Sequence, residues 1–470
     1  MKIDSIDVEA AINNARELIN SEPHLSPALR SSMEVLLLVI TLLFNRATLN
    51  SKNSSKPPSS DPNRKKSSRV KSDKSSGAQS GHTGKTLQKI DDPDDIEILT
   101  IDRRTLPKGK YHQLGFETRQ VFDIDISRLV TEYQAEVLEN AQGQRFVAEF
   151  PEGVTRAVQY GNQIKAHAVY LSQYQLLPYK RIQAYFAEQC QIPISEGTLF
   201  NFNLQAFNQL ADFEQLSKDK LAWASVAHAD ETGININGKR HWLHCASNEN
   251  WTHFYPHQKR GIEAMNEINI LPRFQGILCH DHWKPYYRYD FTHALCNAHH
   301  LRELERAWEQ DNQCWAKEMK QLLNTINQAV ADAGGSLTKK RAALYRQQYR
   351  HLLKRANSEC PPLEHPPGKP KRGRIQRSKA RNLLERLIDY EEDVLRFMDN
   401  PLVPFTNNQG ENDIRITKVQ QKISGCFRSV EGARIFCRVR GYLATCRKQK
   451  INTSRALGLV FEGKLPDFIQ

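Results

Sequence analysis

The sequence contains no C-x-x-C cysteine pair, and we expect neither a secretory leader nor a membrane-spanning helix in it. Its nine cysteines are scattered through 470 residues without a C-x-x-C motif, which favours reduced thiols in a cytosol over a disulfide framework. Met1 is followed by charged and polar residues, unlike a secretory signal. The one continuous apolar run, VLLLVITLLF at 35–44, is shorter than the about 20 residues that a membrane helix needs. We therefore expect a cytoplasmic protein without a membrane partner, in which this run packs as a helix.

Positive charge is abundant, with a formal net charge of +13. A soluble basic protein of this size most often binds nucleic acid, although general solubility is the simpler explanation. Part of the charge lies in residues 51–85, which are rich in Ser, Pro, Gly and Lys and poor in large apolar residues. We expect this segment to be disordered or extended, either as a plain linker or as a tether that neutralises phosphates without reading bases. The linker residues expected to contact DNA are Lys52, Lys56, Arg64, Lys65 and Lys66.

The N-terminal half alternates between helical and strand patterns. Apolar residues at helical spacing before residue 47 predict either a small helical bundle or a self-association helix. Alternating residues between 95 and 160 predict strands. Helical spacing returns at 164–215, where Ser195 is expected to cap a helix. That part is either a helix-turn-helix DNA reader or an ordinary helical connector.

From residue 222 the pattern indicates an α/β mixed sheet of the ribonuclease-H-like kind. The segments WASVAHADETG, KRHWLHCAS and NWTHFYPH predict three strands in a meander, GIEAMNEIN a helix, and GILCHDH a further strand. A short strand near 293–296 and helices over 299–357 follow. A basic, Pro- and Gly-rich break covers 360–381, and helices resume over about 379–399 and after 408.

Together these patterns divide the chain into eight segments. They are an N-terminal helical region (1–47), a basic linker (48–90), a small β-rich module (91–160), a helical region that could hold the helix-turn-helix (161–220), the first part of the mixed-sheet core (221–298), a helical insertion (299–400), a helix and basic region after it (401–450), and a C-terminal tail (451–470).

Three acidic residues stand where catalytic carboxylates are expected in such a sheet. Asp230 lies at the expected end of the first strand, Asp281 at the end of a later strand, and Glu411 at the start of a helix. Cutting and joining phosphodiesters with two hard cations requires oxygen ligands that converge in one place. Each Asp alone is weak support, because turns favour Asp anyway; the three in this order are more specific.

Several stretches of the chain resemble insertion-sequence-66 family transposases. The resemblance rests on the linker SKNSSKPPSSDPNRKK, on HADETG, GKRHWLH and CHDHWKPYY, and on VPFTNNQGENDIR with the block that follows it. It implies a ribonuclease-H-like core interrupted by a helical insertion, with Asp230, Asp281 and Glu411 as the catalytic, metal-binding acids. It further implies Mg²⁺ or Mn²⁺, double-stranded DNA as transposon ends and target, strand cleavage followed by strand transfer, and a homodimer or larger synaptic assembly. The expected location is the bacterial cytoplasm, at the nucleoid when bound to DNA.

The sequence departs from the family pattern in two places. No cysteine precedes Cys190, so residues 91–160 cannot hold the thiolate zinc site common in the family, and no zinc is expected. The motif around Glu411 reads GEN, with Gly410 and Asn412 where Ala and Arg are more usual. These departures favour, as an alternative, a catalytically inactive transposase-derived DNA-binding protein. A structure-specific nuclease without strand transfer is a third possibility.

Residues near the acids have structural as well as functional interpretations. His228 shares the face of Asp230 and is either a core histidine or a residue that orients a metal-bound water. Glu231 is expected to point to the opposite face, in a structural role or in support of the metal ligands. The aromatic residues Trp283, Tyr286 and Tyr287 suit either stacking on an unpaired base or core packing. Cys296, His299 and His300 supply too few ligands for zinc, so we expect a structural role or, with Arg302, a phosphate contact.

Basic residues after Glu411 predict a track for the DNA backbone, with a solvated helix face as the alternative. Those expected to bind DNA are Arg415, Lys418, Lys422 and Arg428. The same block also contains Arg434, Arg438, Arg440, Arg447, Lys448 and Lys450.

Overall fold

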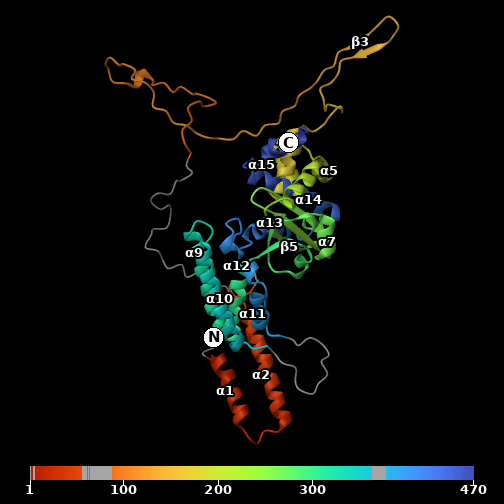
Figure 1. Cartoon of the computed structure of the whole chain (residues 1–470). Helices are drawn as coiled ribbons and strands as arrows, with labels where there is room; N and C mark the ends of the chain where they lie inside the picture. Colours follow the sequence, from red (N-terminus) through yellow and green to blue (C-terminus); the bar gives the residue numbers. More distant parts are fainter. Residues whose placement is uncertain are drawn as a thin grey trace.

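A computed structural model describes residues 2–3, 6–54, 61, 63, 87–362 and 377–469 of the chain. The molecule has a body built around one sheet, a layer of long helices beside it, a helical hairpin at one end and an extended arm at the other (Figure 1). Of the linker residues expected to bind DNA, Lys52 is described and exposed. Lys56, Arg64, Lys65 and Lys66 lie outside the described residues.

The central sheet has five strands in the order β7-β6-β5-β8-β9. The first three strands along the chain pair antiparallel, whereas β8 lies parallel to β5 and β9 parallel to β8. The predicted meander, helix and two further strands are thereby confirmed, as is the mixed sheet. The strands are β5 (Val226–Ile236), β6 (Lys239–Ser247), β7 (Thr252–His257), β8 (Ile277–His280) and β9 (Thr292–Leu295), and the intervening helix is α7 (Ile262–Ile268).

The register of β5 with β8 sets the position of the two aspartates. His228 is paired with Cys279 across these parallel strands. Two residues further along each strand direction come Asp230, within β5, and Asp281, just after β8, so the two acids lie side by side where the parallel pairing of β5 with β8 ends. Because side chains alternate between faces, both share the face opposite to Ala229, which packs towards α7.

Helices cover both faces of the sheet. The face that carries Asp230 is covered by α13 (Asn408–Ser424) and α14 (Val430–Lys448), which contact β5, β6 and β7. Around α14 lie α3 (Asn162–Val169), α4 (Tyr179–Cys190), α5 (Glu196–Gln209), α6 (Ala211–Ala222) and α15 (Thr453–Phe461), which share one apolar core with it. The cap predicted at Ser195 is confirmed, since its hydroxyl accepts a hydrogen bond of 3.0 Å from Thr198 N.

Five helices stand between β9 and α13 and form a layer with its own core. That core contains fully buried Trp315, Met319, Tyr349 and Leu384. The predicted helical segments are confirmed, with turns that divide them. The helices are α8 (Asn297–Asp311), α9 (Cys314–Asp332), α10 (Lys339–Glu359), α11 (Lys379–Asp389) and α12 (Glu391–Asp399).

The N-terminal hairpin consists of α1 (Val8–Ser21) and α2 (Pro27–Ala47). The apolar run of α2 belongs to a helix of 21 residues, longer than the run itself, that is long and apolar enough to cross a membrane. The packing expected for this run is not seen, because none of the described residues of α2 is buried. A signal sequence and the core helix of a soluble protein can be equally long and apolar, so these features alone assign no location. The hairpin is attached to the helical layer where Gln310 donates to Asn45 O and Asn53 donates to Glu309.

The arm, residues 87–160, is extended and largely exposed (Figure 1). Its regular structure is a short 3₁₀ turn (Arg103–Thr105) and one antiparallel hairpin, β3 (Val137–Glu139) with β4 (Arg145–Val147). The strands predicted at 96–102 and 118–126 are not formed. Alternating residues form a stable strand only when a partner covers their apolar face, and these apolar side chains are exposed.

Gly276, directly before β8, gives a test of how tightly the strand that leads to Asp281 is held. A Cβ at this position would lie 2.6 Å from Ser225 O and still closer to Ala224 O, both of them backbone atoms. We expect Gly276→Ala to lower the free energy of unfolding by about 1–3 kcal/mol, as overpacking does, measured by urea denaturation. Gly197→Ala is the control, because its nearest contact is Ser195 Oγ at 3.8 Å. Equal midpoints for the two variants would contradict this account.

Candidate active site

Asp230 and Asp281 are held by local backbone hydrogen bonds at the edge where β5 and β8 run in parallel. Asp230 accepts a hydrogen bond of 2.8 Å from Glu231 N, and Asp281 accepts one of 3.1 Å from Trp283 N. The backbone turns sharply after Asp281, because His282 has a φ of 69° in the left-handed region. This turn directs the chain away from the sheet and leaves Asp281 beside Asp230.

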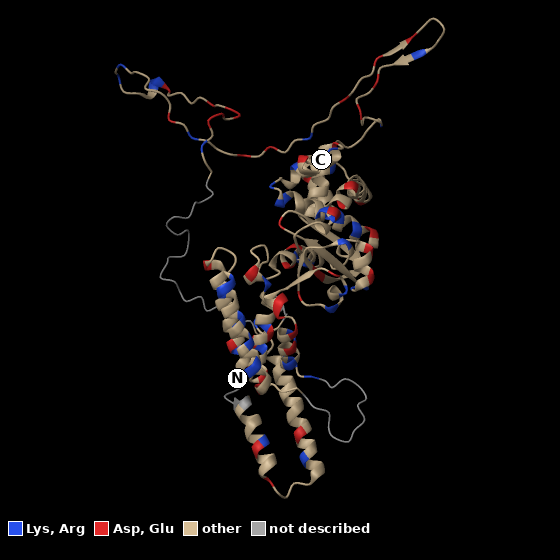
Figure 2. Ribbon diagram, viewed as in Figure 1, with Lys and Arg blue, Asp and Glu red and all other residues tan. Residues whose placement is uncertain are grey.

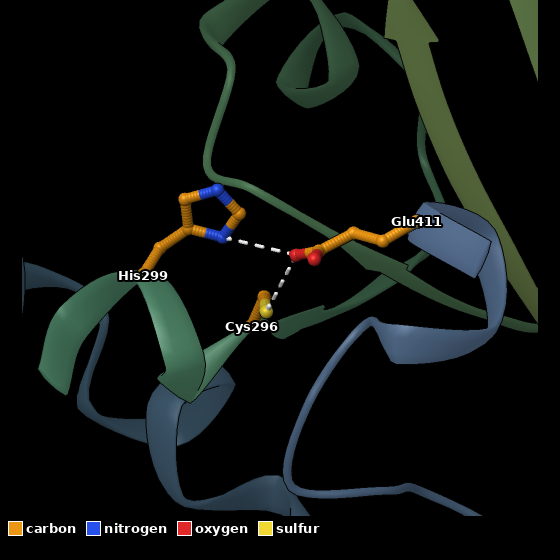
Figure 3. A group of neighbouring side chains, drawn as sticks. All are labelled: Cys296, His299 and Glu411. Carbon is orange, nitrogen blue, oxygen red and sulfur yellow. Dashed lines mark hydrogen bonds and ion pairs between the residues drawn. The ribbon is translucent and has the colours of Figure 1, made fainter. Parts of the chain in front are cut away.

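Glu411 lies in the first turn of α13, within the group of side chains drawn in Figure 3. Its Oε1 atom is 3.7 Å from His299 Nδ1, 3.9 Å from Arg302 Nη2 and 3.9 Å from Cys296 Sγ. The predicted Arg302 side chain therefore lies against the carboxylate of Glu411.

The charges of Asp281 and Glu411 both act on Asp230. Burial, together with the negative charges of Glu231, Asp281 and Glu411, raises the pKa of Asp230 to about 8. A cluster of acids of this kind repels additional negative charge and is stabilised by a cation. The ligand atoms that Asp230, Asp281 and Glu411 offer are all carboxylate oxygens, which Mg²⁺ and Mn²⁺ prefer. The residues present therefore fit a hard divalent cation.

Asn407 fixes Glu411 relative to Asp230, and sequence reasoning assigned no role to it. Its Nδ2 donates to Ala229 O at 2.9 Å, and its Oδ1 lies 2.7 Å from His228 Nδ1. Its backbone carbonyl accepts a 3.1 Å hydrogen bond from Glu411 N. The only sequence signal was its place in the quoted TNNQGEN motif.

Gly410 permits this close packing. A Cβ on Gly410 would lie 3.2–3.4 Å from the amide of Asn407 and from His228 Cβ, tighter than most such contacts. Glycine is a poor helix former, but at this position the absence of a side chain allows the first turn of α13 to approach β5 directly.

Glu231 points to the opposite face of the sheet, as alternation along a strand requires. There its buried carboxylate pairs with Arg260 at 2.6 Å and accepts a 2.6 Å hydrogen bond from Tyr286 Oη. Tyr286 is buried, and Tyr287 stacks on His293 with centroids 4.1 Å apart, so both belong to the packing. Trp283 is partly exposed beneath the Arg260 guanidinium, 4.0 Å from its ring centroid.

Three predicted basic residues continue from Glu411 along one face of α13. Arg415, Lys418 and Lys422 are exposed. Arg415 comes four residues after Glu411, and the successive steps to Lys418 and Lys422 are three and four residues, so all lie on one helical stripe. Lys418 reaches the sheet, where it donates to Gly233 O at 3.2 Å. Arg428, beyond the helix end, is also exposed.

Three other basic residues of the C-terminal block, Arg438, Arg440 and Lys448, do not lie on this track, contrary to the prediction. Arg438 pairs with Glu214 at 2.6 Å, Lys448 pairs with Asp413 at 2.7 Å, and Arg440 is buried. Periodicity places them on α14, whose sheet-facing side is internal. Along the described part of the ribbon, basic and acidic residues are interspersed (Figure 2).

A pocket of about 360 Å³ adjoins the group around Glu411. It lies between the start of the linker, α8 and α11. Its lining includes His299, Arg302, Arg306, Lys379 and Arg386, with Glu303 as the acidic member. This excess of guanidinium and ammonium groups suits a phosphate.

Comparisons with known proteins agree with these features. The family model described as "Transposase IS66 family" matches residues 157–435, which include all three acids. A second model, described as a family of unknown function (DUF6444), matches residues 4–88. No curated protein matches the sequence. Because the first match covers more than half of the sequence, the chain belongs to the IS66 family of transposases.

Proposed function

We propose that this chain catalyses DNA transposition by metal-dependent strand cleavage and strand transfer at insertion-sequence ends. The observation that carries the proposal is the register of β5 with β8, which sets Asp230 beside Asp281 on the face approached by Glu411. The proposal treats the sheet and its helices as a ribonuclease-H-like core. The order β7-β6-β5-β8-β9, antiparallel on one side of β5 and parallel on the other, supports that assignment.

Asp230, Asp281 and Glu411 would hold Mg²⁺ or Mn²⁺. When bound, two such cations activate an oxygen nucleophile, neutralise charge at phosphorus and stabilise the leaving oxygen. The protein contributes position: β5 and β8 fix the aspartates, and Asn407 fixes the helix turn that carries Glu411. In the proposed reaction, water first frees a 3′-hydroxyl at the transposon end, and that hydroxyl then attacks target DNA.

The proposed substrate is double-stranded DNA, both transposon ends and target. The stripe of Arg415, Lys418 and Lys422 would follow the phosphate backbone towards the acids, with Arg428 beyond it. Arg302 and the pocket beside it would take a phosphate close to Glu411. The helices α4 and α5 remain the candidate helix-turn-helix. Because two ends must be handled together, we propose a homodimer or larger synaptic assembly.

A catalytically inactive DNA-binding protein is the second candidate. It is favoured by Asn412, which is exposed in the first turn of α13 and carries no charge to contact phosphate. Transposition and DNA binding alone are separated by the experiments that follow.

Replacement of the acids tests catalysis. We expect Asp230→Asn, Asp281→Asn and Glu411→Gln each to reduce cleavage and joining by more than about a hundredfold, since loss of even an outer-shell partner costs about 10–100-fold. Activity is measured with Mg²⁺ on labelled transposon ends, and a pre-cut end reports joining separately. The control is Asp290→Asn, an exposed acid close to Asp281 in the chain. Inactive wild-type protein that still binds DNA would favour the second candidate, and cleavage without joining would favour a nuclease.

Asn407→Ala tests the positioning of Glu411. It removes the side-chain hydrogen bonds to β5 while leaving all three acids in place. We expect about a 10–100-fold loss of joining rate. We also expect weaker binding of Mg²⁺, measured as a higher Mg²⁺ concentration at half-maximal rate. Asn324→Ala, on the exposed face of α9, is the matched control. An unchanged rate and Mg²⁺ dependence would show that Asn407 has no positioning role.

The basic stripe predicts a salt effect. We expect the triple variant Arg415→Gln, Lys418→Gln and Lys422→Gln to flatten the plot of log affinity against log salt by about 0.9 per lost phosphate contact. Fluorescence anisotropy with duplex DNA measures it. Lys339→Gln, Lys340→Gln and Arg341→Gln remove the same charge from exposed positions on α10. Equal slopes for the two triple variants would show that charge alone, and not its place on α13, determines binding.

A further inference from the structure

A second group of ligand atoms lies beside the two aspartates. Cys296 at the end of β9, His299 in the first turn of α8 and Glu411 in the first turn of α13 converge from three elements (Figure 3). One ligand atom from each lies within 4.8 Å of the other two. A sulfur, an imidazole nitrogen and a carboxylate oxygen thus surround one point.

The separations match the edges of a small coordination polyhedron. Glu411 Oε1 is 3.7 Å from His299 Nδ1 and 3.9 Å from Cys296 Sγ. In a tetrahedral zinc site the metal-ligand bond lengths give ligand–ligand edges of roughly 3.3–3.6 Å. A contraction of a few tenths of an ångström would bring Glu411 Oε1 to coordinating distance from both partners, and the sulfur and the imidazole nitrogen already lie within 4.8 Å of each other.

The surrounding structure prepares the sulfur of Cys296 to bind a metal ion. Cys296 Sγ accepts a 3.1 Å hydrogen bond from Asn407 N, and such bonds stabilise a thiolate.

His299 can supply its Nδ1 atom as a ligand without losing a hydrogen bond. Its buried Nδ1 atom has no hydrogen-bond partner among the described residues, because Glu411 lies beyond hydrogen-bonding distance.

We propose that Cys296, His299 and Glu411 bind a thiophilic divalent cation of the Zn²⁺ class, with the fourth position open to water or a substrate oxygen. On binding, the thiol proton is released to solvent. The expectation of no zinc rested on the absence of cysteine from residues 91–160 and on too few ligands in the C-x-x-H-H motif. The structure supplies the additional ligand from Glu411, 115 residues along the chain from Cys296.

Binding at this site does not depend on the proposed catalysis, but its consequence does. Glu411 is shared with the proposed Mg²⁺ site, so a Zn²⁺ ion held by Cys296 and His299 would occupy the carboxylate that completes that site. If the proposed function holds, Zn²⁺ inhibits strand transfer and excess Mg²⁺ does not displace it readily from a thiolate ligand.

Cobalt spectroscopy on the full chain tests the site directly. Co²⁺ substitutes for Zn²⁺ and gives a near-ultraviolet sulfur-to-cobalt charge-transfer band when a thiolate binds it. We expect one equivalent of Co²⁺ to produce this band, and Zn²⁺ but not Mg²⁺ to abolish it. Cys296→Ser should remove the band, and His299→Gln and Glu411→Gln should weaken Co²⁺ binding by at least about a hundredfold.

Matched variants separate this site from other thiols and from catalysis. Cys314→Ser, at an exposed cysteine, should keep the band. Asp230→Asn should keep it while losing strand transfer, so failure of the metal site and failure of the proposed function are distinguishable. His299 is partly exposed, so His299→Gln serves if Cys296→Ser does not fold, as judged by circular dichroism. No band in the wild type, or a band that survives Cys296→Ser or is lost in Cys314→Ser, would overturn the proposal.

Discussion

The arrangement of the acidic site depends on the hydrogen bonds of one buried amide, that of Asn407. Its side chain is bonded to β5 beside Asp230, its backbone N–H to Cys296 and its carbonyl to the turn that carries Glu411. One residue therefore joins the central strand, the end of β9 and the start of α13. A buried amide with these partners specifies a single geometry, because any shift leaves polar groups unpaired in the interior.

That geometry concentrates negative charge where protein alone does not neutralise it. On the far side of the sheet, Glu231 is compensated by Arg260 and Tyr286. On the near side, Asp230 is buried beside other acids and its pKa rises to about 8. The same strand thus carries a satisfied carboxylate on one face and an acidic cluster that favours a cation on the other. The contrast is what distinguishes a candidate catalytic face from a structural one.

Local patterns predicted much of this arrangement. Strand and helix periodicity located all five strands and the helices between β9 and α13, and strand-end placement identified Asp281, which directly follows β8. The expected position of Asp230 at a strand end was wrong, because β5 continues to Ile236 through its pairing with β6. Glu411 needed the family resemblance, because a helix start gives no sign of what it faces. Contacts between distant parts of the chain were missed: Asn407 on Ala229, and Arg438 and Lys448 turned inward. Periodicity shows that a residue is on a face but not which partner covers that face. The arm has an alternating pattern as well, but among the described residues no other element covers its apolar side chains, and most of the predicted strands do not form.

The central claim is that Asp230, Asp281 and Glu411 form one cation site for DNA chemistry. An anomalous difference map from crystals of the protein grown with Mn²⁺ and a cleaved DNA end tests it most directly. The account predicts an anomalous peak between the Asp230 and Asp281 carboxylates, and a second one at Glu411 facing the DNA 3′ end. Manganese bound elsewhere, or Glu411 remote from both aspartates in that complex, would contradict it.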